Sequence, residues 1–127
     1  MKLDNYILKT LNSDQLSINF IALDEGKAIG MCNLLAYDGI SKDLSPWITD
    51  LVVDKYYQSH GIGGKLLDVA TKKARDLNYD SLYLFVLEPK LQDYYTKKGF
   101  KTIGKDVFDA HGIKYDVHVM QKNIGNL

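Results

Sequence analysis

The sequence predicts an α/β fold in the α+β sense, with a central mixed β-sheet and flanking helices, and three observations carry this prediction. Apolar, β-favouring runs occur at residues 17–23, 47–53 and 81–87. Residues 62–77 have apolar side chains at helical spacing. This helix stands between two of the runs, which predicts a β-α-β crossover and a parallel pair of strands. The chain of 127 residues is expected to form a single domain, 1–127.

The first sixteen residues precede the first clear strand and are ambiguous. Apolar side chains at positions 6, 7, 8 and 11 fit one face of a short helix, which the polar residues 12–14 would end. After them, residues 17–23 and 27–37 are apolar and flank the turn-forming segment Asp24-Glu25-Gly26. This arrangement predicts a β-hairpin.

The rest of the chain alternates predicted strands and helices. Residues 47–53 are expected to form a strand that is buried on both faces. The helix at residues 62–77 is expected to end at Asn78. The remaining elements are a strand at 81–87, a helix at 91–98 that stops at Gly99, and strands at 100–107 and 114–121 joined by a turn at His111 and Gly112. The expected order is ββ-β-α-β-α-ββ in one mixed sheet.

Composition argues against several classes of protein. Sixteen Lys and Arg residues balance sixteen Asp and Glu residues, so no charge excess is present to hold nucleic acid. No apolar run approaches the ~20 residues of a membrane span, and the N-terminus lacks the pattern of a signal peptide. The single cysteine, Cys32, is expected in the core, and no Cys and His cluster has zinc-ligand spacing. We therefore expect a cytoplasmic protein with no metal, no nucleic-acid partner and no membrane partner.

The glycine-rich segment QSHGIGGK, residues 58–65, lies between a predicted strand and a predicted helix. The free N–H groups and the positive dipole end of a helix form an anion site, and glycines let a phosphate group come close. A dinucleotide-binding fingerprint needs a third glycine where this chain has Leu66. A P-loop needs a glycine where this chain has Ser59, and a Ser or Thr where it has Leu66. Both of these nucleotide motifs therefore fail, and another phosphate-bearing ligand is expected.

Two motifs in this region together resemble a known family. Gln58, Gly61 and Gly63 form the pattern Gln-x-x-Gly-x-Gly, which resembles the coenzyme A pyrophosphate loop of the GNAT superfamily of N-acetyltransferases. The segment YYTKKGF, residues 94–100, resembles the aromatic-Tyr-x-Lys-x-Gly-Phe signature of the same family. The resemblance covers roughly residues 17–121, and it implies a GNAT-like fold with acetyl-CoA as the donor.

The resemblance also implies where acetyl-CoA binds. The pantetheine arm is expected to pair with the main chain of Leu51, Val52 and Val53, as an added strand would. The N–H of Leu51 or Val52 is expected to stabilise the carbonyl oxygen that gains charge during the reaction. The loop expected to hold the pyrophosphate consists of Gln58, Ser59, His60, Gly61, Ile62, Gly63, Gly64 and Lys65.

Catalytic roles follow from the same resemblance. Tyr95 matches the family tyrosine that donates a proton to the departing coenzyme A thiolate, whereas Tyr94 is expected to pack in the core. Asp50 is the candidate base for the incoming amine, acting directly or through a water molecule, and Glu88 is the second choice. Lys97 is a candidate for contact with the cofactor phosphates, although such lysines are usually solvated.

The sequence departs from the family pattern at its start. The family usually begins with a strand and two helices, and sixteen residues before the hairpin are too few for all three. The N-terminal part is therefore shortened, or belongs to a longer chain, or is complemented by another subunit. Two functions stay open: an N-acetyltransferase acting on a primary amine, and a catalytically weak acyl-CoA-binding module with a regulatory or assembly role. A homodimer, formed by adding the C-terminal strand to a partner's sheet, is also plausible.

Overall fold

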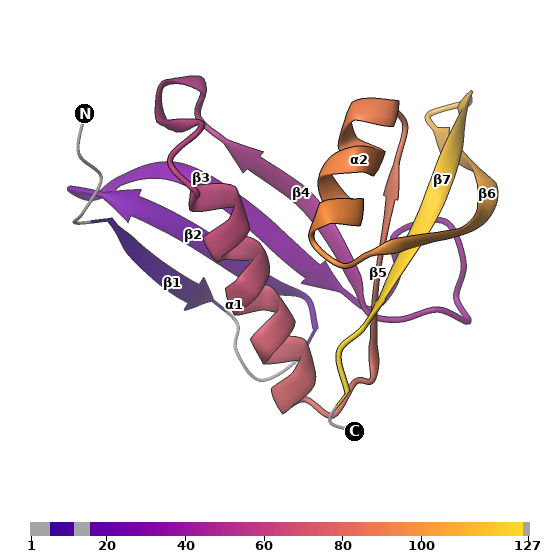
Figure 1. Cartoon of the computed structure of the whole chain (residues 1–127), viewed down its shortest axis with the longest axis horizontal. Helices are drawn as coiled ribbons and strands as arrows, with labels where there is room; N and C mark the ends of the chain where they lie inside the picture. The colour runs from indigo at the N-terminus through magenta and orange to yellow at the C-terminus, as the bar shows by residue number, and fades with distance from the viewer. Residues whose placement is uncertain (1–5, 12–15, 126–127) are drawn as a thin grey trace.

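The computed structural model describes residues 6–11 and 16–125 of the chain. Figure 1 shows one sheet with both helices on its near side. The elements are β1 (Ile7–Leu11), β2 (Ile18–Asp24), β3 (Lys27–Leu35), β4 (Trp47–Val53), the 3₁₀ turn η1 (Lys55–Tyr57), α1 (Ile62–Asp76), β5 (Ser81–Val86), α2 (Pro89–Lys97), β6 (Lys101–Ala110) and β7 (Ile113–Asn123). The predicted hairpin, crossover helix and later strands are all present.

The strands form one seven-stranded sheet in the order β1-β2-β3-β4-β5-β7-β6. Neighbouring strands are antiparallel except β4 and β5, which are parallel. The prediction of a mixed sheet with a GNAT-like order of elements is therefore confirmed. The last strand, β7, lies between β5 and β6, so it cannot join a partner's sheet as the sequence suggested. The free edge at this end belongs to β6.

The sheet opens between β4 and β5. These two strands pair at Trp47 and Tyr83, and the Tyr83 N–H donates to the Pro46 carbonyl at 3.0 Å. From that point they diverge toward their C-terminal ends, and α2 lies beside the gap (Figure 1). Helix α1 packs on β2, β3 and β4, whereas α2 packs on β5 and β6. The molecule therefore consists of two half-sheets that are joined at one end and separated at the other.

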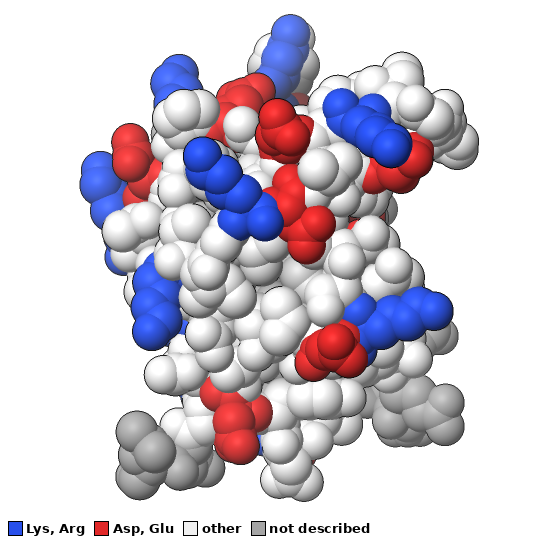
Figure 2. All heavy atoms as spheres, turned by 90° about the vertical axis from the view of Figure 1, so that its right-hand side faces the viewer, with Lys and Arg blue, Asp and Glu red and all other residues white. Residues whose placement is uncertain are grey.

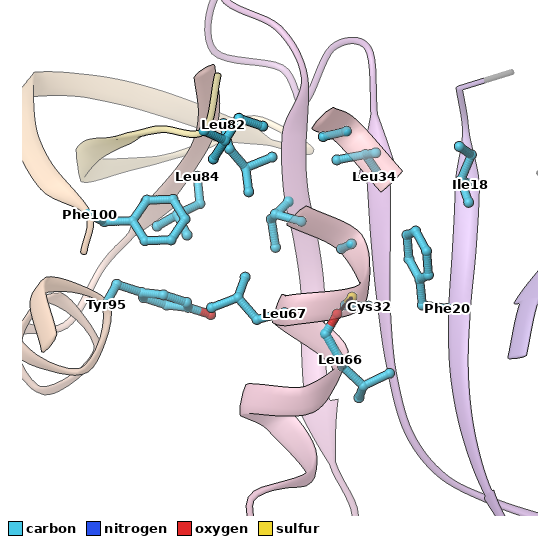
Figure 3. Close-up of a cluster of buried hydrophobic side chains, with 14 of the residues drawn as sticks. Ile18, Phe20, Cys32, Leu34, Leu66, Leu67, Leu82, Leu84, Tyr95 and Phe100 are labelled. Carbon is cyan, nitrogen blue, oxygen red and sulfur yellow. Dashed lines mark hydrogen bonds between the residues drawn. The ribbon is translucent and has the colours of Figure 1, made fainter. Parts of the chain in front are cut away.

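Helix α1 buries the apolar face that its sequence predicts. Its buried side chains include Ile62, Leu66, Leu67, Ala70 and Ala74, and Figure 3 shows Leu66 and Leu67 in the buried cluster with Phe20 and Tyr95. Gly30 on β3 lets the helix lie close, because a Cβ atom there would come within 3.1 Å of the Leu66 Cδ1 atom and 3.3 Å of the Val52 carbonyl oxygen. Asn78 follows the helix with a positive φ of 71°, as expected for a residue that ends a helix.

The N-terminal helix prediction is wrong over the described part of that segment. Ile7–Leu11 is a strand that pairs antiparallel with β2, from Ile7 opposite Leu23 to Leu11 opposite Asn19. Leu8 packs toward the core, whereas Ile7 is 58% exposed. The free backbone groups along the edge of β2 outweigh the helical spacing of the apolar residues. The predicted break at residues 12–14 lies outside the described residues.

The expectation that β4 is buried on both faces holds only for its first half. Trp47 and Ile48 are buried, whereas Asp50 is exposed and Val52 is 55% exposed. The Val52 side chain lies with Met31 on the face of the sheet that neither helix covers. The divergence of β5 separately leaves the main chain of the second half of β4 without a neighbouring strand on that side. The exposed half lies where the resemblance predicts the cofactor arm.

Charge and cysteine placement agree with the composition. Figure 2 shows Lys and Arg side chains interspersed with Asp and Glu on the face that carries β6 and β7. Cys32 is fully buried, its Sγ atom lies 3.8 Å from the Leu66 carbonyl oxygen, and burial raises its pKa to about 12. Within residues 6–11 and 16–125, no helix is both long enough and apolar enough to cross a membrane.

Candidate functional site

Three adjoining cavities follow the opening between the half-sheets. The glycine pocket, of about 270 Å³, is lined by Val53, Tyr57, Gln58, Ser59, Gly61, Ile62, Gly63, Gly64, Tyr94 and Lys98. The middle pocket, of about 310 Å³, is lined by Leu51, Val53, Gln58, Gly63, Leu91, Tyr94 and Tyr95. The carboxylate pocket, of about 350 Å³, is lined by Asp38, Ile48, Thr49, Asp50, Leu51, Leu84, Phe85, Val86, Leu91, Tyr95 and Phe108. Each pocket shares lining residues with the next, so the three form one groove.

The glycine pocket contains the N-terminus of α1. Gly61 precedes the helix with a positive φ of 80°, a conformation that favours glycine, and no side chain caps the first turn. The first-turn N–H groups therefore have no intrahelical partner. No acidic residue occupies the first turn of this fully described helix. Free donors and a positive dipole end with no nearby carboxylate in that turn suit a phosphate group.

The glycine at position 63 is not required by packing inside the chain. A Cβ atom there would lie 3.6 Å from the Tyr94 hydroxyl and 3.7 Å from the Val53 Cγ2 atom, which are ordinary contact distances. Gly63 lines both the glycine pocket and the middle pocket. The space beside Gly63 therefore belongs to the groove. A phosphate group of a ligand can approach the main chain there.

Polar contacts tie the loop before α1 to the end of β4. The Gln58 side-chain amide donates to the Val53 carbonyl at 3.0 Å. Asp54 caps the 3₁₀ turn by accepting from the Tyr56 N–H at 3.0 Å, and its own N–H donates to the Ile29 carbonyl at 2.8 Å. The loop that carries the glycines is therefore held in place by the strand that lines the rest of the groove.

The structure selects a different lysine from the one the sequence suggested. Lys98 lines the glycine pocket, and its ammonium lies 5.6 Å from the centre of the Tyr94 ring. Lys97 is exposed and lies outside the three pockets, as do His60 and Lys65. Lys98 lies one helical turn after Tyr94, which also lines this pocket, but Tyr94 was itself expected in the core, so no sequence signal pointed to Lys98.

The prediction that Tyr94 packs in the core is wrong, because Tyr95 is the buried member of the two adjacent tyrosines. Tyr94 is 36% exposed and lines the groove, whereas Tyr95 is 8% exposed and packs edge-on against Phe100 at 5.7 Å between ring centres. Figure 3 shows the Tyr95 hydroxyl directed toward Leu67 of α1. Burial raises the pKa of Tyr95 to about 12, with smaller contributions from Tyr94 and Cys32. Tyr95 therefore keeps its proton at neutral pH, at the boundary between the middle and carboxylate pockets.

The main chain of β4 borders the groove. The side chains of Leu51 and Val53 line the middle pocket, whereas the Val52 side chain lines a separate cavity on the other face of the sheet with Met31. Among the described residues, β4 pairs with β5 only at Trp47, so its later peptide groups have no strand on that side. An extended chain bearing amide groups can hydrogen-bond there.

A β-bulge turns Asp50 toward the groove. Asp50 has a positive φ of 54°, which is unfavourable for a residue with a Cβ atom, and Asp50 and Leu51 together lie opposite Cys32. The Asp50 Oδ2 atom accepts from the Asn33 side-chain amide at 3.0 Å and from the Thr49 hydroxyl at 3.3 Å. Asn33 in turn accepts from the Asn19 amide at 2.6 Å. This chain of hydrogen bonds orients the carboxylate.

The structure adds Asp38, which the sequence did not single out. Asp38 lines the carboxylate pocket with Asp50, and burial, followed by the charge of Asp50, raises the pKa of the Asp38 carboxyl to about 6. Its neighbour Gly39 has a φ of 86°, and a Cβ atom there would lie 3.0 Å from the Phe108 ring. The loop at residues 36–46 therefore packs against β6, which no local sequence signal indicated.

Glu88, the second candidate base, lies away from this arrangement. It is exposed at the N-cap of α2 and is absent from the lining of the three pockets. Trp47 is fully buried, and its indole N–H donates to the Leu44 carbonyl at 2.6 Å. Trp47 is therefore a core residue.

Similar structures share this fold. A GNAT family acetyltransferase from Elizabethkingia anophelis with acetyl-CoA bound is 17% identical, with a TM-score of 0.73 over 94% of this chain and 99% of its own. An IAA acetyltransferase from Bacillus cereus is 16% identical, with a TM-score of 0.71 and the same coverage. A GNAT family acetyltransferase from Streptococcus pneumoniae is 27% identical, with a TM-score of 0.68 over 86% of this chain and 67% of its own.

Sequence comparison assigns the family. A search of curated proteins finds no match. The sequence model of the acetyltransferase (GNAT) family matches residues 2–100, a stretch that contains both the glycine loop and the Tyr95 motif. Because this match spans well over half of the chain, and because the fold and the groove agree with it, the chain belongs to the acetyltransferase (GNAT) family of enzymes.

Proposed function

We propose that this protein is an N-acetyltransferase that moves the acetyl group of acetyl-CoA to the nitrogen of a primary amine. The observation that carries the proposal is the continuous groove. It begins at the uncapped N-terminus of α1, follows the unpaired half of β4, and reaches the buried Tyr95 and the two carboxylates of the carboxylate pocket. The helix N-terminus suits the phosphates of the donor, the unpaired half of β4 suits its amide groups, and the carboxylates suit the amine.

The donor side of the groove is formed by main-chain groups and one cation. The N–H groups of Ile62, Gly63 and Gly64 face the pyrophosphate, and Lys98 offsets its negative charge. The main chain of Leu51 and Val53 pairs with the amide-bearing pantetheine arm. Bound acetyl-CoA supplies the acyl thioester. The space beside Gly63 supports this placement, because the chain's own packing does not use it.

The acceptor side holds the groups that move protons. Asp50 takes a proton from the incoming ammonium, directly or through a water molecule, and the Asn33 amide keeps its carboxylate in position. The N–H of Leu51 or Val52 donates to the carbonyl oxygen as that oxygen gains charge.

Tyr95 acts on the leaving sulfur. Its hydroxyl donates a hydrogen bond, and then its proton, to the sulfur of the departing thiolate. Its pKa of about 12 exceeds the ordinary thiol value of ~8.5, so complete proton transfer is uphill. The hydrogen bond therefore contributes most of the stabilisation, and the tyrosine is restored to its neutral form by solvent protons.

The test begins with isothermal titration of the purified chain with acetyl-CoA, followed by thiol release from the same samples with a panel of amines. Binding with turnover on any amine supports the proposal. Binding without turnover on any amine would instead favour an acyl-CoA-binding regulatory or assembly module. Absence of binding would overturn the assignment of the glycine pocket.

We further propose a domain organisation, a cellular location and an oligomeric state for the chain. The chain acts as a single domain, it works in the cytoplasm, and it forms a homodimer, for which the free edge of β6 (Lys101–Ala110) is the candidate interface. Light scattering after size-exclusion chromatography measures the mass in solution. A monomer mass across the accessible concentration range would contradict the dimer.

A further inference from the structure

We propose that the acceptor is a small amine with a single positive charge, whose ammonium group binds between Asp38 and Asp50 and whose compact apolar or aromatic body lies against Phe85 and Phe108. This inference rests on the proposed acetyl transfer and names the class of acceptor. It follows from the size, charge and walls of the carboxylate pocket, which ends the groove beside Tyr95.

The charge of the pocket selects a cation. Asp38 and Asp50 both line it, and none of its described lining residues is a lysine, arginine or histidine. The two printed partners of the Asp50 carboxylate, Asn33 and Thr49, are neutral donors. An ammonium in this pocket therefore meets two acidic side chains and no competing cation among the lining residues. Burial, and after it the charge of Asp50, raises the pKa of the Asp38 carboxyl to about 6.

The walls of the pocket select an apolar body. The Phe85 and Phe108 rings lie 5.0 Å apart between centres, and Trp47 packs on Phe85 at 6.5 Å. Aromatic faces attract both apolar groups and a nearby cation. Gly39 packs closely on the Phe108 ring, so the loop that carries Asp38 is held against the aromatic wall of the pocket.

The arrangement favours one charge over several. Asp38 and Asp50 line the same cavity, so both carboxylates border the space that one ammonium would occupy. A second ammonium on the same molecule would find no third acid among the lining residues. The volume of about 350 Å³ is at the small end of the range for ligand pockets, which suits a small molecule.

The reaction balances with such an acceptor. The ammonium loses one proton, through Asp50 to water, before its nitrogen forms the N–C bond to the acetyl carbon. The C–S bond breaks, and the sulfur leaves as a thiol with a proton delivered through Tyr95. The second proton lost by the nitrogen goes to solvent, so the products are an amide, a thiol and one net proton.

The test measures binding and turnover separately. Binding of 2-phenylethylamine to the chain saturated with coenzyme A is followed by NMR titration, and thiol release is measured with 2-phenylethylamine, ethylamine, spermidine and a lysine-containing peptide. We expect 2-phenylethylamine to have the highest kcat/KM. We expect Asp38→Asn to weaken its binding and raise its KM at least about 10-fold, with kcat changed less than about 3-fold.

The matched control is Asp68→Asn, which removes the same charge from an exposed position on α1 outside the three pockets. It is expected to leave both binding and KM unchanged. Phe108→Leu, which keeps an apolar side chain, is expected to raise the KM for 2-phenylethylamine more than that for ethylamine.

Each outcome decides between the two proposals. Preference for spermidine or the lysine peptide, unchanged binding in Asp38→Asn, or failure of 2-phenylethylamine to bind the wild-type chain would each overturn the acceptor inference while leaving acetyl transfer standing. Binding that depends on Asp38 without thiol release from any amine would support the pocket assignment and overturn the proposed enzyme activity.

Discussion

The two ends of the groove are built in different ways. The glycine pocket draws mainly on one continuous stretch, residues 53–64, and acts through main-chain N–H groups at a helix N-terminus. The carboxylate pocket draws on side chains from the loop at residues 36–46 and from β4, β5 and β6. A main-chain site leaves a compact motif in the sequence, whereas a side-chain site assembled from distant segments leaves none.

The two ends also have opposite electrostatic character. The helix N-terminus and Lys98 attract an anion, whereas Asp38 and Asp50 attract a cation. Tyr95 lies between them and lines both the middle and carboxylate pockets. This polarity is what the proposal requires, because an anionic donor and a cationic acceptor would then meet near Tyr95.

Reversing the charge of the glycine pocket should have the largest effect on the donor end of the groove. Gly63→Glu places bulk and a negative charge where a phosphate is proposed to bind, so acetyl-CoA affinity should fall at least about 1,000-fold, or about 4 kcal/mol. Isothermal titration measures it. Gly104→Glu is the control, because it adds the same side chain on β6 where a Cβ atom has open space. Equal affinities in the two variants would contradict the pocket assignment.

Removing the hydroxyl between the two ends should impair turnover and spare donor binding. Tyr95→Phe keeps the packing against Phe100 and deletes only the donor, so kcat should fall roughly 100-fold with acetyl-CoA affinity changed less than about 2-fold. Thiol-release kinetics and calorimetry separate the two quantities. Tyr115→Phe, on the exposed part of β7, is the matched control. An unchanged kcat would remove Tyr95 from the mechanism.

Two glycine substitutions should sharpen the distinction between glycines kept for packing and glycines kept for a ligand. Gly30→Ala places a methyl group against Leu66 and the Val52 carbonyl, so it should lower the free energy of unfolding by about 1–2 kcal/mol. Gly63→Ala meets only ordinary contacts and improves helix propensity, so it should leave stability unchanged or raise it by up to about 1 kcal/mol. It should nevertheless weaken acetyl-CoA binding.

Denaturant unfolding measures both glycine variants under the same conditions. If Gly63→Ala were as destabilising as Gly30→Ala, the glycine at position 63 would be explained by packing. If Gly63→Ala bound acetyl-CoA as tightly as the wild-type chain, the space beside it would not be part of the donor site. Either result would contradict the proposal that Gly30 is kept for packing and Gly63 for binding acetyl-CoA.

A smaller effect is expected on the pH dependence of the free energy of unfolding, through the titration of Asp38. The folded-state pKa of Asp38, about 6, lies above the ordinary value of ~3.9, so the folded chain holds this proton more tightly. Its contribution to stability is therefore lost as pH rises from about 4 to about 6. Asp38→Asn removes the titrating group, so its stability relative to wild type should rise across that window and then level off. Solvent screening keeps the gain below about 1 kcal/mol, because the residue is only half-buried.

Denaturant unfolding at several pH values between 4 and 8 measures this difference, with Asp68→Asn as the variant that removes the same charge outside the three pockets. A difference between Asp38→Asn and wild type that did not change with pH would contradict the raised pKa. A stability gain at pH 7 combined with weaker amine binding would show that the pair is kept for function at the expense of stability.

Particular residues show why some predictions succeeded. Helix α1 and the strands on either side of it were predictable because their apolar periodicity coincides with burial, as at Leu66 and Leu67. The position of the loop from Gln58 to Gly64, between β4 and α1, was predictable from its glycines, whereas its role as a phosphate site stays a prediction. The motif at residues 94–100 located the buried Tyr95, although its neighbour Tyr94 was wrongly assigned to the core.

The predictions that failed depend on long-range contacts. Ile7–Leu11 forms a strand because the edge of β2 is available to it, and Val52 of β4 is exposed because neither helix covers its face of the sheet. Lys98 lines the glycine pocket only once α2 and the loop before α1 come together in the fold. Each outcome depends on where another segment lies, which the spacing of residues within one segment does not show.

Local pattern alone was enough to predict the family and the order of the later elements and to propose the donor loop, because each depends on residues near one another in the chain. Only the tertiary structure revealed the carboxylate pocket. It brought Asp38, Asp50, Phe85 and Phe108 from four separate segments into one pocket, and it raised the pKa of Asp38 by burying it beside Asp50. Burial and charge proximity are properties of the folded chain, so a site that depends on them is specified only by packing.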